Sequence, residues 1–151
     1  MKSDIRLSET TERVVRASRA DARDWLAAAP VCTALASHGI LHVGSAEVMH
    51  PYEVKRPDLS GTFIMACTAG EGRVWLEGRW QPMRPRTACL APPHAFHAYR
   101  AVPRQPWHIA WVRYQEPNGA LPLVNTRAPV LADFDGAPLA AAIGGLHAEA
   151  Q

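Results

Sequence analysis

Short segments rich in β-branched and aromatic residues recur along most of this chain, and proline, glycine or charged pairs separate them. The pattern begins after Gly39 and continues to Tyr114 without an intervening helical period. The segments are ILHVGSAEV, YEVKR, TFIMACT, RVWLE, RWQPM, TACLA, HAFHAYRA and WHIAWVRY. Strands that recur about every eight to twelve residues are typical of an antiparallel sandwich or barrel. The sequence therefore predicts a mainly β fold.

Length and composition indicate one globular unit with an ordinary surface. The chain has 151 residues, of which 48% are hydrophobic and 20% are charged. No run reaches the roughly 18 apolar residues that a membrane span requires, and the N-terminus lacks the apolar core of a secretion signal. We therefore expect a cytoplasmic protein without a membrane partner. A net charge of +2, with scattered Lys and Arg, does not predict a nucleic-acid surface.

The chain divides into three predicted parts. Residues 1–39 form an N-terminal arm with a short helix, for which the stretch from Asp21 to Ala29 is the candidate because Pro30 would end it. Residues 40–115 form the barrel. Residues 116–151 form a loop and the start of a dimerisation helix.

The apolar pattern of the last segment supports that helix. Leu139, Ile143 and Leu146 fall on one stripe at helical spacing, Asp135 is a candidate N-cap, and Pro138 is tolerated in a first turn. The stripe is expected to face the barrel or a second copy of the chain. Because it runs to the last residues, we expect the chain to be part of a longer protein.

The firmest local prediction is a hairpin in RVWLEGRWQPM. Glu77-Gly78 lies between alternating residues like a two-residue turn, which makes Trp75 and Trp80 cross-strand partners. Pro82 cannot donate a ladder hydrogen bond, so it should lie at a sheet edge or at a position that does not donate to the ladder.

Alternation also assigns the faces of two later strands. In PWHIAWVRY it places Trp107, Ile109, Trp111 and Arg113 on one face. In HAFHAYR it places His97 and Tyr99 together, directed inward, with His94 outward at the rim. The two histidines should therefore not share a metal ion, and the sequence predicts neither a metal site nor a cofactor. The three cysteines are interpreted as small hydrophobic residues in a reducing compartment.

Residues 56–114 resemble the N-terminal effector-binding and dimerisation domain of AraC-type bacterial transcription regulators. The resemblance rests on an ordered series of motifs: an Arg-Pro opening, Gly70-x-Gly72, a hairpin through Gly78, a second Arg-Pro pair at 84–85, Pro92-Pro93, His97-x-Tyr99 and a Trp-rich final strand. It implies a cupin-like, jelly-roll barrel that binds a small effector, and a homodimer. It also implies that DNA is bound only through a C-terminal helix-turn-helix domain, which this chain does not contain.

The resemblance further implies a ligand site in the mouth of the barrel. Arg56 matches an arginine that can contact ligand, Tyr99 and Trp111 match pocket aromatics, His97 matches the cupin histidine, and His42 falls near another pocket position. Ile109, on the same face as Trp111, completes the predicted ligand-binding set. Aromatic walls with a few polar groups suit a small polar metabolite such as a sugar or sugar acid. Alternatively, Arg56 is a surface arginine paired with Asp58.

Two turns depart from the family's pattern. The usual Pro-Gly-Asp is Pro85-Arg86-Thr87 here, and the loss of a residue that tolerates positive φ predicts a different turn type. The usual glycine after the two prolines is His94, which can occupy the left-handed region more readily than most residues.

We expect a sensor and not an enzyme. A metal-dependent cupin enzyme would carry two histidines one residue apart and a nearby glutamate, where this chain has Ser60-Gly61-Thr62. A metal-free cupin isomerase or lyase stays open, with His97 and Tyr99 as acid/base groups. So does a dimerisation module with a vestigial pocket.

Overall fold

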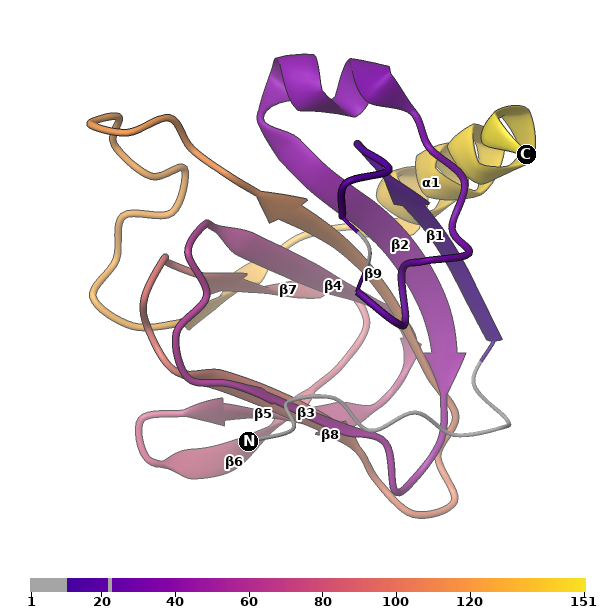
Figure 1. Cartoon of the computed structure of the whole chain (residues 1–151). Coiled ribbons are helices and arrows are strands. Elements are labelled where there is room, and N and C mark those ends of the chain that lie inside the picture. The colour runs from indigo at the N-terminus through magenta and orange to yellow at the C-terminus, as the bar shows by residue number, and fades with distance from the viewer. Residues whose placement is uncertain (1–10, 22) are drawn as a thin grey trace.

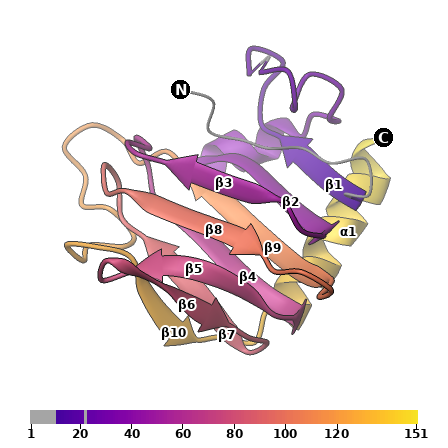
Figure 2. The same cartoon turned by 90° about the horizontal axis from the view of Figure 1, so that it is seen from below.

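The predicted β segments pair into two antiparallel sheets that face each other (Figures 1 and 2). The structure is a computed structural model and describes residues 11–21 and 23–151. Within those residues the larger sheet has six strands in the order β1-β2-β9-β4-β7-β10, and the smaller has four in the order β3-β8-β5-β6. The predicted mainly β, cupin-like fold is confirmed.

The strands have the following bounds: β1 Thr11–Arg16, β2 Ile40–Val48, β3 Glu53–Arg56, β4 Phe63–Gly70, β5 Gly72–Leu76, β6 Arg79–Met83, β7 Thr87–Ala91, β8 His97–Ala101, β9 Trp107–Tyr114 and β10 Val130–Asp133. A 3₁₀-helix, η1 (Thr33–His38), precedes β2, and the helix α1 (Ala137–Ala150) follows β10. No helix in the described part of the chain is long and apolar enough to cross a membrane.

Alternation along the strands divides the buried residues into two clusters on opposite faces of the larger sheet. The inner cluster lies between the sheets and includes Met65, Trp107 and Trp111, whereas the outer cluster includes Val15, Val112 and Ile143. The outer cluster is covered by α1, which lies against β1, β2 and β9 (Figure 1). The period of two therefore determines which side chains enter the barrel and which contact the helix.

The C-terminal helix forms as its apolar stripe predicts. Ile143 is buried, and Leu139 and Leu146 are half-buried against the outer cluster. The carboxylate of Asp135 accepts the backbone N–H of Ala137 at 3.1 Å, although the N-cap position itself is Gly136. The stripe faces the barrel.

Both segments outside the predicted barrel add a strand to the larger sheet. Thr11–Arg16, which lies in the predicted N-terminal arm, pairs with β2 from Thr11↔Glu47 to Arg16↔His42. Val130–Asp133, which lies in the predicted loop, pairs with β7 as β10. The expectations for residues 1–10 lie outside the described residues.

The short helix before the barrel is η1, and residues 24–28 of the candidate stretch form turns instead. The reason is a tertiary contact from β1. The side chain of Arg16 donates to the carbonyl oxygens of Asp21, Ala27 and Ala29 at 2.9 to 3.0 Å. These are backbone acceptors that a continuous helix would use itself.

The predicted hairpin is confirmed. Trp75 pairs with Trp80, and their ring centroids are 5.4 Å apart in an edge-on arrangement. Glu77 and Gly78 both have positive φ, 54° and 77°, as a type I′ turn requires. Pro82 lies in β6, at the edge of the smaller sheet, as its missing donor predicts.

The prediction of a changed turn at Pro85-Arg86-Thr87 is wrong at the level of the backbone. Arg86 itself adopts the left-handed conformation with φ 69°. His94, with φ 64°, does the same, as expected. Both loops thus keep a positive φ without a glycine.

Candidate functional site

One end of the barrel, called the mouth here, carries polar side chains across the larger sheet. The register aligns Arg16 of β1 with His42 of β2, His42 with Arg113 of β9, and Arg113 with Phe63 of β4. All four are at most 7% exposed. A row of two arginines and a histidine at the end of an otherwise apolar interior marks this end as the place for polar chemistry.

The smaller sheet brings three of the predicted site residues to the same end. Arg56 and His97 are cross-strand partners, and Tyr99 lies two pairs further along, on the same face of β8. The guanidinium of Arg56 donates to the hydroxyl of Tyr99 at 2.7 Å and lies 5.1 Å from the ring centroid of Phe63. The ring of Phe63 stacks on that of His97, with centroids 5.2 Å apart and planes 9° apart.

Trp111 and His42 form a second pair beside this group. The indole N–H of Trp111 donates to Nδ1 of His42 at 3.2 Å, and the rings of Trp25 and His42 are nearly perpendicular, with centroids 5.1 Å apart. Gly44 leaves the space for the indole, because a Cβ at that position would clash with it. The family resemblance put His42 only near a pocket position, and the structure shows it in direct contact with Trp111.

Burial keeps both mouth histidines neutral. Desolvation, followed by repulsion from nearby arginines, lowers the pKa of His42 and of His97 to about 3. The same causes lower the pKa of Arg113 to about 10, so it stays charged at neutral pH. The positive charge at the mouth is therefore carried by the arginines.

The open space lies above these residues and not among them. A hollow of about 430 Å³ is lined by Arg23, Asp24, Trp25, Arg56, Pro57, Asp58 and Leu59. Of the predicted set only Arg56 lines it, while His42, His97, Tyr99 and Trp111 are at most 4% exposed. The turns at residues 23–29, anchored by Arg16, cover the mouth with Trp25 and the fully buried Leu26.

The rim of the mouth carries an exposed pair. His94 points outward, with its side chain 67% exposed, and its Nδ1 lies 2.7 Å from a carboxylate oxygen of Asp58. Asp58 thus pairs with His94, while Arg56 donates to Tyr99. Within the described ranges no group of three or more His, Cys, Asp or Glu side chains could hold a metal ion.

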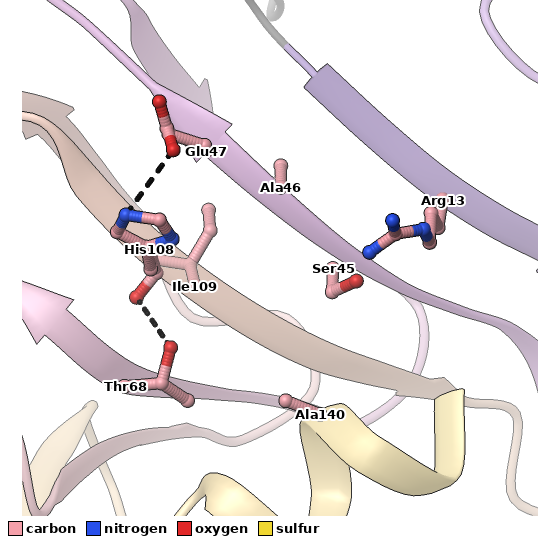
Figure 3. A pocket seen from close by; sticks show the side chains of 8 residues that line it. All are labelled: Arg13, Ser45, Ala46, Glu47, Thr68, His108, Ile109 and Ala140. Atoms are coloured by element: carbon pink, nitrogen blue, oxygen red, sulfur yellow. Dashed lines mark hydrogen bonds and ion pairs between the residues drawn. The ribbon is translucent and has the colours of Figure 1, made fainter. Parts of the chain in front are cut away.

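A second hollow lies on the outer face of the larger sheet, beside the start of α1 (Figure 3). Its volume is about 330 Å³. Three of its polar residues contact one another: His108 Nε2 lies 3.3 Å from a carboxylate oxygen of Glu47, and Thr68 donates to the carbonyl of His108 at 3.3 Å. Ile109 borders this hollow as well as the inner cluster. Ile109 is not among the residues that line the mouth hollow.

Sequence reasoning missed several residues at the mouth. Arg113 shares a face with Trp111, so the alternation along the strand correctly predicted that it points inward. It was not included among the predicted ligand-binding residues. Phe63 joins Arg56 to His97 through its ring. Arg23 and Trp25 lie in turns whose position over the mouth depends on Arg16, and no local pattern signals that contact.

Comparison with known proteins places the chain in one family. A sequence model described as the AraC-like ligand binding domain matches residues 48–150. No curated protein matches the chain.

Solved structures resemble the chain at low sequence identity. Protein YlbA from E. coli is 9% identical with a TM-score of 0.52, covering 88% of this chain and 48% of its own. Apo ToxT K231A from Vibrio cholerae is 7% identical with a TM-score of 0.50, covering 75% of this chain and 48% of its own. A cupin domain of an XRE family transcriptional regulator from Enterobacter cloacae is 18% identical with a TM-score of 0.44, covering 50% and 82%. The chain thus spans about half the length of YlbA and of ToxT.

Proposed function

Because the chain belongs to the family of AraC-like ligand binding domains, we propose that it senses a small-molecule effector at the mouth of its barrel. The observation that carries the proposal is the hollow of about 430 Å³ that ends on Arg56, directly beside the Tyr99, Phe63 and His97 rings. Pockets for small ligands typically have volumes of roughly 300 to 1,000 Å³ and combine apolar walls with a few placed polar groups. The effector is a small polar metabolite.

Strand β1 supplies a physical link between the mouth and the outer surface. Its inward residue Arg16 holds the turns that cover the mouth, and the next residue toward the N-terminus, Val15, lies in the outer cluster with Ile143 of α1. An effector that moves Trp25 therefore acts on the strand against which α1 lies. In a regulator this helix would dimerise with a second copy, and a separate domain outside this sequence would contact DNA.

Acid/base catalysis by His97 is the weaker alternative. A general base must be oriented toward the proton it takes, usually by a second hydrogen-bonding group. Neither ring nitrogen of His97 has a hydrogen-bond partner among the described residues. A pKa of about 3 also makes its imidazole a weak base at neutral pH.

The test is a thermal-shift screen of sugars, sugar acids and small carboxylates, followed by calorimetric titration of variants with any compound that stabilises the protein. A ligand at 100 times its Kd stabilises by about 2.7 kcal/mol, which is readily detected. Arg56→Ala and Trp25→Ala should weaken binding at least about tenfold, because each removes a side chain that lines the hollow. Arg79→Ala, at an exposed position on the edge strand β6, is the matched control and should bind normally.

Unchanged affinity in folded Arg56→Ala and Trp25→Ala proteins would show that the effector binds elsewhere.

A further inference from the structure

Arg113 is a buried cation whose hydrogen-bonding groups are only partly satisfied. The residue is 6% exposed. Its Nη1 donates to the carbonyl of Tyr114 at 2.8 Å, and its Nη2 makes a long contact of 3.4 Å with the hydroxyl of Ser60. Its Nε has no partner among the described residues. Arg16, in the same row, instead donates from Nε and both terminal nitrogens to three carbonyls.

The acids near Arg113 are committed to other partners. Asp21 forms a two-point pair with Arg23, at 2.8 and 2.9 Å. The carboxylate of Glu116 accepts hydrogen bonds from Thr62 and from the backbone N–H of Leu123. In the part of the chain that the structure describes, no carboxylate lies within 4.0 Å of the Arg113 guanidinium. A buried charge without a counter-charge is costly unless an anion is supplied from outside.

His97 adds unpartnered hydrogen-bonding capacity at the same place. It is 2% exposed, and both of its ring nitrogens lack a partner among residues 11–21 and 23–151. Arg56 and Arg113 are the charges that act on it. A neutral imidazole carries one N–H that can donate to an anionic oxygen.

We propose that the effector is an organic acid whose carboxylate binds at Arg56, Arg113 and His97 and whose apolar body occupies the hollow beside Trp25 and Leu59. This inference rests on the proposed effector function and deepens it. Guanidinium groups pair with carboxylates through two parallel hydrogen bonds, and such bonds are strongest away from water. Trp25 lies between the hollow and the buried row, so it moves aside as the acid reaches Arg113.

The experiment measures Kd by calorimetry for acids and their neutral amides: benzoate and benzamide, phenylacetate and phenylacetamide, hexanoate and hexanamide, glucuronate and glucuronamide. Wild-type protein should bind at least one acid about tenfold or more tightly than its amide, as expected for charge-assisted hydrogen bonds. Arg113→Met and, separately, Arg56→Met should lose that preference. Arg79→Met, an exposed arginine outside the mouth, should keep it.

The unliganded proteins provide a second readout. The Tm of Arg113→Met should equal or exceed that of the wild type, because a similar apolar side chain replaces an incompletely paired buried charge. Equal affinities for acids and amides would overturn the organic-acid inference while leaving effector sensing in place. Binding of neither set by folded wild-type protein would overturn both.

Discussion

His97 illustrates how position alone sets the chemistry of a residue at the mouth. Its ring is enclosed by Phe63 on one face and lies near two arginines, so the charged form of the imidazole is strongly disfavoured. His94, three residues earlier, is exposed and pairs with Asp58 at the rim. The same side-chain type thus serves as a neutral interior group in one case and a solvated one in the other.

This difference predicts a pH dependence of stability. The pKa of His97 falls from 6.5 to about 3 on folding. Below pH 6.5 the unfolded chain binds a proton that the folded protein does not bind. The free energy of unfolding should therefore fall as the pH falls from about 6.5 toward 3, by up to about 1.4 kcal/mol per pH unit for His97 and similarly for His42.

Urea unfolding at pH values between 5 and 7, followed by tryptophan fluorescence, measures this slope. His97→Phe should remove its share of the slope, because the unfolded variant has no proton to bind there. His38→Gln, at an exposed position, is the matched control. An identical slope in wild type and His97→Phe would contradict the assignment.

Several turns between the strands of this protein adopt the left-handed backbone conformation at residues other than glycine. Arg86, His94 and Glu77 all have positive φ. Arg86 and His94 precede β7 and β8, each of which pairs with a strand on both sides. Glu77 lies in the turn of the β5–β6 hairpin. Sheet pairing therefore determines the backbone conformation of the turn, and the residue adopts it at the cost of some strain.

Substitutions at Glu77-Gly78 in the β5–β6 hairpin measure the cost of the left-handed backbone conformation. Gly78 has φ 77°, and a Cβ added there meets no atom within 4 Å, so Gly78→Ala tests backbone conformation without a clash. It should lower the free energy of unfolding by about 1 to 2 kcal/mol. Glu77→Asn should leave it unchanged or raise it, because asparagine is favoured in type I′ turns. Urea unfolding measures both, and a neutral Gly78→Ala would show that the turn rearranges.

For the whole molecule, α1 closes the outer face of the larger sheet and exposes a second face of its own. Ile143 is buried against the sheet, whereas Ala141, Gly145 and Ala148 are exposed. Small exposed side chains allow another helix to approach closely. This surface is the one we propose for dimerisation.

Sedimentation velocity over a range of protein concentrations tests the dimer. The wild type should associate as concentration rises, and Ala141→Arg should dissociate it, because a charge at a close helix contact is not tolerated. Ala120→Arg, at an exposed loop position, should behave as the wild type does. A wild-type protein that is monomeric at every concentration would contradict the proposal.

Features that depend on neighbouring residues could be predicted from the amino-acid sequence. The period of two in β8 and β9 directed His97, Tyr99, Trp111 and Arg113 inward, and Glu77-Gly78 specified the hairpin. The apolar stripe specified α1. In each case the cause is local backbone geometry, which the order of side chains reports directly.

The closure of the mouth and the balance of its charges depend on contacts between residues that are distant in the sequence. The turns at residues 23–29 depend on carbonyls bonded by Arg16 of β1, and β1 itself depends on pairing with β2. The residues that line the hollow also differ from the predicted ligand-binding residues, apart from Arg56. Tyr99 and His97 are buried beneath Phe63 and Arg56, and the hollow lies above them. Such contacts join residues far apart in the chain. The free energy of these contacts depends on how deeply the polar groups are buried and on whether each one has a hydrogen-bond or ion-pair partner. No local sequence pattern encodes either property.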